Sequence, residues 1–140
     1  MKYLFIILLF FFISCEKEEN LKIINQNLVL ELKSFIKEVD ENSPCKSDYI
    51  TIRISENEIK MANYQPELSE DFIGMIEFDK SKIYLFSSND YSNYVKVIYG
   101  KKKEKEKKLE SKESCDPPMY RILLIDKRDK NKFRIVNIEK

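Results

Sequence analysis

The spacing of hydrophobic residues changes twice along the chain. An unbroken apolar run from Leu4 to Ile13 is followed by charged residues, and helical spacing begins at Leu21. Beyond a polar stretch at residues 40–44 the period becomes two. This pattern predicts one amphipathic helix followed by short strands.

The helical segment presents its apolar residues on one face. It ends before Asp40, where residues 40–44 have a polar composition typical of a loop and include the helix-stopping Pro44. We therefore expect a helix of about four or five turns that packs by one side. Its apolar positions are Leu21, Ile24, Leu28, Leu32, Phe35, Ile36 and Val39.

The strand segments begin at Ile50, where isoleucines alternate with polar residues through Ile54, as in a half-buried strand. Most segments are joined by short turns and there is no strand–helix–strand alternation, so an antiparallel sheet is favoured over a parallel one. The predicted fold is α+β, with one N-terminal amphipathic helix packed on an antiparallel meander sheet of six or seven strands. The other expected strands are 58–64, 72–78, 82–87, 94–99, 119–126 and 132–139.

The N-terminus has the three parts of a secretory signal peptide. Lys2 precedes the apolar run, and the small residue Ser14 closes it. The run of ten residues is about half the length needed to span a bilayer. Phe12-Ile13-Ser14-Cys15 resembles the bacterial lipoprotein signal, although Phe12 stands where Leu is usual. The alternatives are ordinary cleaved secretion and an uncleaved anchor.

The resemblance to lipoproteins implies a division of the chain. Residues 1–14 would be removed, Cys15 would be diacylated, residues 15–20 would form a tether and residues 21–140 a single domain. The protein would then be held on a membrane by its lipid. Glu16-Lys17-Glu18-Glu19 resembles a signal for export to the outer surface, which favours the outer membrane or cell surface. A periplasm-facing position and a plain charged tether are the alternatives.

Lipidation would also account for the odd number of cysteines. The chain has three, and acylation of Cys15 leaves Cys45 and Cys115 as a pair in an oxidising compartment. We expect a disulfide bond between these two. Free thiols and a metal site are the alternatives, but two thiols without any histidine make a poor zinc site.

Composition removes several classes of function. The absence of histidine excludes Ser-His-Asp and Cys-His nucleophiles, and two glycines cannot form a phosphate-cradling loop. Ser34-Phe35-Ile36-Lys37 matches the Ser-x-x-Lys motif, but the chain lacks its companion motifs. Carboxylate pairs are numerous and none stands out. Balanced charge gives no case for nucleic acid. We expect no enzyme activity, no cofactor and no metal.

Two polar stretches are candidates for contact. Ser87–Tyr94 is rich in Tyr, Asn and Ser, which binding loops favour, and its candidate residues are Asn89, Asp90, Tyr91 and Asn93. The alternative is an ordinary polar hairpin loop. Residues 101–112 hold seven lysines among glutamates, which suits anionic headgroups or glycans as well as a solvated loop.

The function that these features favour is a non-enzymatic, lipid-anchored envelope protein that binds a protein partner, as an inhibitor or immunity-like protein. An accessory lipoprotein of an envelope complex and a small-ligand binder are the alternatives. A helix followed by a meander resembles cystatin-like and NTF2-like domains in topology only. We expect the start of the helix to lie nearest the lipid, and the Ser87–Tyr94 loop to face outward with Tyr91 at its tip.

Overall fold

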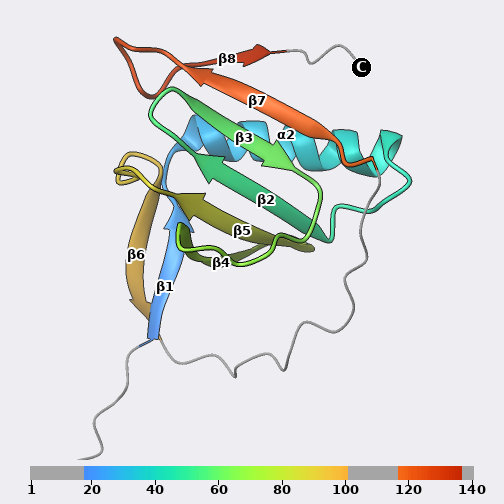
Figure 1. The fold of residues 1–140 in the computed structure, drawn as a ribbon, viewed down its shortest axis with the longest axis horizontal. Coiled ribbons are helices and arrows are strands. Elements are labelled where there is room, and N and C mark those ends of the chain that lie inside the picture. The colour runs from blue at the N-terminus through green and yellow to red at the C-terminus, as the bar shows by residue number, and fades with distance from the viewer. Residues whose placement is uncertain (1–17, 101–116, 137–140) are drawn as a thin grey trace, which may run out of the picture.

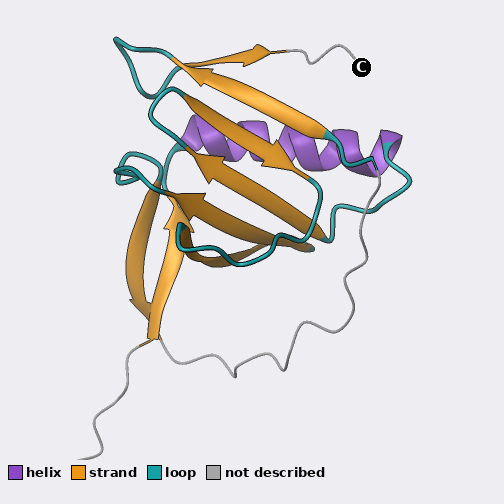
Figure 2. Cartoon of the chain, viewed as in Figure 1, coloured by secondary structure: helices purple, strands orange, loops and turns teal. Residues whose placement is uncertain are grey.

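The computed structural model describes residues 18–100 and 117–136, which form eight strands and one helix. Figures 1 and 2 show the helix lying across one face of the larger sheet. The elements are β1 (Glu18–Ile23), α2 (Gln26–Asn42), β2 (Tyr49–Ile54), β3 (Glu58–Ala62), β4 (Phe72–Phe78), β5 (Ser81–Ser87), β6 (Val95–Gly100), β7 (Tyr120–Ile125) and β8 (Phe133–Val136).

The α+β class is confirmed, with a fold that consists mostly of sheet. All seven predicted strand segments overlap strands β2 to β8. The expectation that the helix is the first element is wrong, because β1 precedes it. Residues 18–20, assigned to the tether, belong to this strand. The helix-first order that suggested cystatin-like and NTF2-like domains is therefore not the order of the elements.

The helix begins later than its periodicity predicts because Asn25 caps it. The Asn25 side chain accepts a hydrogen bond from the Leu28 backbone N–H, as an N-cap residue does. At the other end the helix continues to Asn42, three residues past the expected end, and the Ser43 N–H donates to the Val39 carbonyl. The predicted apolar face is confirmed between these caps, where the buried residues are Leu28, Leu32, Phe35 and Val39.

The larger sheet has the strand order β4-β5-β2-β3-β7-β8 and is mixed. The β2 strand pairs antiparallel with β3 but parallel with β5, in a register that sets Ile52 opposite Leu85. The expected antiparallel meander is therefore wrong at this junction. The chain crosses from the end of β3 to the β4 edge, and the β4–β5 hairpin then places β5 beside β2. As a central strand, β2 is also more deeply buried than expected, since Thr51 is only 1% exposed.

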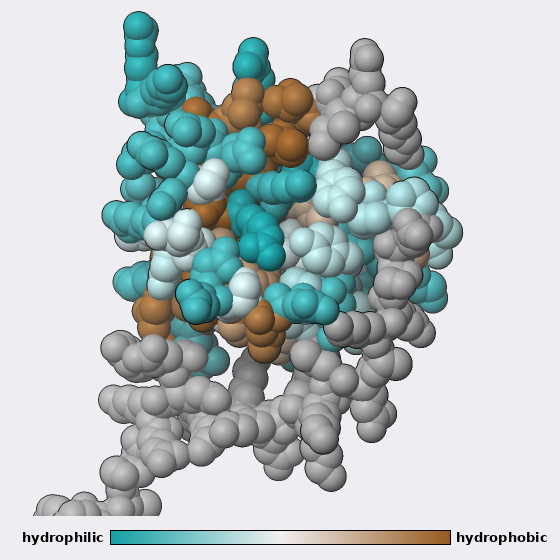
Figure 3. Space-filling view, viewed as in Figure 1, coloured by the Kyte–Doolittle hydropathy of each residue, from teal (hydrophilic) through white to brown (hydrophobic). Residues whose placement is uncertain are grey.

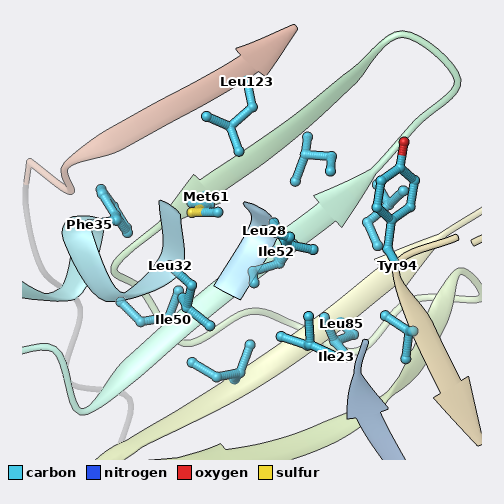
Figure 4. Close-up of a cluster of buried hydrophobic side chains, with 14 of the residues drawn as sticks. Ile23, Leu28, Leu32, Phe35, Ile50, Ile52, Met61, Leu85, Tyr94 and Leu123 are labelled. Atoms are coloured by element: carbon cyan, nitrogen blue, oxygen red, sulfur yellow. The ribbon is translucent and has the colours of Figure 1, made fainter. Parts of the chain in front are cut away.

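The core lies between α2 and the sheet face that it covers (Figure 4). Alternate residues of each strand point to one face, so one set of side chains meets the helix. These sheet residues include Ile50, Ile52, Ile59, Met61, Ile83, Leu85 and Leu123.

Strands β1 and β6 form a second, two-stranded sheet, which we call the arm (residues 18–23 and 95–100). A two-stranded ribbon is marginally stable on its own. The arm is fastened to the core by Ile23 and Val95, both of which are buried. It also approaches β4 closely at Gly74, where a β-carbon would lie 2.5 Å from Leu21 Cδ1. The glycine thus lets the arm pack against the sheet edge.

A charged residue joins α2 to β7. The Arg121 side chain is only 11% exposed, and its guanidinium group pairs with the Glu31 carboxylate at 3.4 Å and with that of Glu38. It also donates to the Glu31 carbonyl at 3.3 Å and lies 5.5 Å from the centre of the Phe35 ring. Arg121 therefore fastens the helix to an outer strand where apolar packing gives way to solvent.

Replacing this arginine tests the fastening. Arg121→Met should lower the free energy of unfolding by about 1–3 kcal/mol, because two carboxylates lose a partly buried partner yet remain half-hydrated. Urea unfolding measures the change. Arg134→Met on β8 is the matched control, since Arg134 is exposed, and it should stay within about 0.5 kcal/mol of wild type. Equal effects of the two substitutions would contradict this assignment.

Candidate binding surface

Two turns and the start of α2 meet at one end of the molecule. The turns are the Ser87–Tyr94 loop and the β7–β8 turn, residues 126–132 (Figure 1). The Asn25 side chain donates to Asn131 Oδ1 at 2.9 Å and to the Asn93 carbonyl at 3.5 Å. One buried helix cap thus holds both turns. Figure 3 shows mostly hydrophilic side chains along this end, at the left of the view.

The Ser87–Tyr94 loop is held by its own hydrogen bonds. Asp90 Oδ1 accepts from the Ser92 N–H at 2.9 Å, and Ser87 Oγ accepts from the Asn89 N–H at 3.2 Å. The hydrogen bond from the Ser92 backbone is the main reason that the pKa of Asp90 is lowered. The loop is therefore ordered before any contact is made, which reduces the entropy cost of binding.

The structure divides the four candidate residues of this loop into two kinds. Asn89, Asp90 and Asn93 are exposed, and neither asparagine side chain bonds to another of the described residues. Tyr91 is half-buried and packs against the hydrophobic core. Its carbonyl accepts the backbone N–H groups of Tyr94 and Val95. The expectation that Tyr91 stands at the loop tip is therefore wrong.

The β7–β8 turn is a neighbour that the sequence did not single out. Asp126 Oδ1 accepts from the backbone N–H groups of Arg128 at 2.7 Å and Asp129 at 3.1 Å, and these bonds lower its pKa. Lys127, Arg128 and Lys130 are exposed around it. In the sequence, Asp126 before a short polar stretch indicates an ordered turn. It does not indicate that this turn lies beside the Ser87–Tyr94 loop.

Tyr94 joins the two turns through its ring and its hydroxyl group. The hydroxyl donates to the Lys130 carbonyl at 3.2 Å, and the ring lies 6.1 Å from that of Phe133. Burial raises the pKa of Tyr94, because the phenolate would lose its hydration there. These contacts of Tyr94 hold the two turns, and therefore their exposed residues, in a fixed position relative to each other.

Other predicted site residues lie elsewhere or outside the described residues. Cys45 is disulfide-bonded, whereas Cys15, Cys115 and residues 101–112 fall outside the described ranges, so the pairing with Cys115 stays a prediction. Ser34 and Lys37 are exposed on α2, and Lys37 lies 3.9 Å from Glu41 in an ordinary helical ion pair. This placement gives the Ser-x-x-Lys match no catalytic surroundings.

Asn63 brings the flanks of the expected disulfide together. Its side chain donates to Ser43 Oγ at 3.1 Å and accepts from the Met119 N–H at 2.6 Å. Ser43 lies two residues before Cys45, and Met119 four residues after Cys115. Four extended residues reach roughly 13 Å, so the predicted pairing lies within reach of these anchored flanks.

The described part of the chain holds no group of three or more His, Cys, Asp or Glu residues that could bind a metal ion. Within the same residues, no helix has both the length and the apolar character to cross a membrane. No family model matches the sequence, and neither the curated proteins nor the solved structures contain a significant match.

The role of Tyr91 can be measured directly. Tyr91→Ala should lower the free energy of unfolding by about 1–3 kcal/mol, because a half-buried ring leaves the edge of the core. Asn89→Ala in the same loop should change it by less than about 0.5 kcal/mol, since that side chain is exposed. Denaturant unfolding of both variants gives the comparison. If Tyr91→Ala were as stable as Asn89→Ala, the result would contradict the packing of the Tyr91 ring on the core.

Proposed function

We propose that this protein is a lipid-anchored protein of the cell envelope, at the outer membrane or cell surface, that binds another protein without catalysing a reaction. The lipid is carried by Cys15, and the contact is made by Asn89, Asp90 and Asn93 with the neighbouring β7–β8 turn. An inhibitor or immunity-like role is the sharper form of this proposal. Its support is a fixed, exposed polar surface on a domain whose sequence contains no histidine for a Ser-His-Asp or Cys-His nucleophile.

The observation that carries the proposal is the register of the arm. Glu18 pairs with Gly100 at one end of the arm, and Ile23 pairs with Val95 at the other. At about 3.3 Å per residue, the strand separates these ends by roughly 17 Å. The Ser87–Tyr94 loop comes directly before Val95, whereas Cys15 is three residues before Glu18. A lipid at Cys15 and the proposed contact surface therefore belong to opposite ends of the arm.

The register also bears on how the helix would be oriented. The start of α2 follows Ile23 and lies beside the Ser87–Tyr94 loop, so a lipid at Cys15 would belong to the other end of the arm from the helix start. The helix start, this loop and the β7–β8 turn thus form one surface that would face away from the membrane. Such a surface is accessible to a partner even though the tether between Cys15 and Glu18 is short.

Crosslinking in the cells that naturally produce the protein tests both parts of the proposal. A photoreactive amino acid at Asn93 should form a protein adduct in the membrane fraction, because this exposed position lies in the proposed contact. The same amino acid at Lys33, exposed on α2, is the matched control and should form none. Cys15→Ala should release the protein from washed membranes, because alanine cannot carry the acyl chains that would anchor the protein.

Three results would count against the proposal. Equal adducts from positions 93 and 33 would remove the contact surface. Retention of Cys15→Ala in washed membranes would remove the lipid anchor. An adduct at neither position, in cells that hold normal amounts of the protein, would remove the protein partner.

A further inference from the structure

The arm carries two lysines where repulsion is expected. Lys22 of β1 and Lys96 of β6 are direct partners in the antiparallel register, so their side chains leave the same face of the ribbon. Like charges at directly opposite positions destabilise a pair of strands. Both side chains are exposed, and neither forms an ion pair with a side chain that the structure describes within 20–98 or 117–136.

Apolar side chains stand on both sides of this lysine pair. Ile98 lies on the side of the pair toward Glu18, and Ile24 lies on the side toward the Ser87–Tyr94 loop. Each of these isoleucines is 39% exposed. The opposite face of the arm is the one that packs on the domain, through Leu21, Ile23 and Val95. We call Lys22, Ile24, Lys96 and Ile98 the outer face of the arm. It combines exposed apolar area with two cations that no described side chain neutralises.

This face is continuous with the proposed contact surface. The Ile24 N–H donates to the Tyr94 carbonyl at 2.9 Å, so the pairing of the arm runs directly into the end of the loop. A partner that covers Asn93 would have the outer face of the arm beside it. The repulsion between the lysines is then a cost of the free protein that a suitable partner removes.

We propose that the outer face of the arm is the second half of the partner interface, and that the partner is a protein that presents carboxylates to Lys22 and Lys96. The apolar area of this partner would cover Ile24 and Ile98, because covering them removes apolar area from water. Its carboxylates would meet the two lysines as complementary charges, which favour the correct partner and register. This inference rests on the proposed function. An anionic lipid surface could also neutralise the lysines, but the arm runs away from Glu18, which favours a partner that approaches it from the side.

Zero-length carbodiimide crosslinking tests this contact, because it joins an amine only to a carboxylate that touches it. In intact producing cells, mass spectrometry should map intermolecular adducts to Lys22 and Lys96. The double variant Lys22→Arg/Lys96→Arg keeps both charges without a reactive amine, so it should lose these adducts yet retain the photo-adduct at position 93. Lys33→Arg/Lys80→Arg, at two other exposed sites, should leave the Lys22 and Lys96 adducts unchanged.

A charge reversal separates the contact from the fold. Lys22→Glu should raise Tm by about 1–4 °C, because the opposed pair becomes attractive. The same variant should weaken the photo-adduct at position 93, since it repels an acidic partner. A higher Tm together with weaker partner contact is not expected of a residue with a purely structural role.

The possible outcomes distinguish the two proposals. A photo-adduct at position 93 without carbodiimide adducts at Lys22 or Lys96 would overturn this inference and leave the proposed function standing. Absence of both kinds of adduct would overturn the proposed function. Protection of the two lysines from acetylation on phosphatidylglycerol vesicles, without carboxylate adducts in cells, would overturn this inference and assign the face to lipid.

Discussion

The pairing of β1 with β6 is the constraint on which the functional account depends. The six residues Glu18–Ile23, which include the end of the charged N-terminal segment, are held against a strand far along the chain. Because of this pairing, residues 18–23 form an ordered strand that runs antiparallel to β6. The pairing sets the start of α2 and the Ser87–Tyr94 loop at one end and Glu18 at the other. It also creates the outer face of the arm, with its two opposed lysines.

The arm depends in turn on the core beneath it. A two-stranded ribbon needs a surface to pack on, and it finds one through Ile23, Val95 and the close approach to Gly74. The core itself is made by one helix face and alternate residues of the larger sheet (Figure 4). At its margin Arg121 replaces apolar contact with a paired charge. The exposed turns are thus supported by layers that a sequence pattern describes well.

Most of the secondary structure could be predicted because it follows from local periodicity. The buried face of α2 and the strands β2 to β8 are visible in the spacing of their apolar residues. The failure at β1 has a simple cause, since Leu21 and Ile24 happen to continue the helical spacing while Leu21 and Ile23 also alternate as a strand does. Residues 21–23 form a strand because Asn25 caps the helix after them and because β6 pairs with them. The β6 strand is distant in sequence, so no local pattern reveals this pairing. The parallel β2–β5 pair was missed for the same reason, because hairpin turns indicate only sequential neighbours.

The candidate surface shows the same division. Composition correctly indicated that Asn89, Asp90 and Asn93 are exposed, but it placed Tyr91 at the tip although the ring packs on the core. The β7–β8 turn joined the site only through contacts from Asn25 and Tyr94, which are tertiary. The opposition of Lys22 and Lys96 depends on strand register, and no local pattern encodes it.

The most direct test of this account is native-state hydrogen exchange of the backbone amides in the arm. Because β1 is a paired strand fastened to the core, the cross-strand hydrogen-bonded amides of 18–23 and 95–100 should exchange well below the rates of an unstructured peptide. Their protection should fall only modestly below that of β2 and β5. Unprotected exchange throughout residues 18–23, with β2 and β5 still protected, would show a free tether. That result would contradict the arm and everything that its register implies.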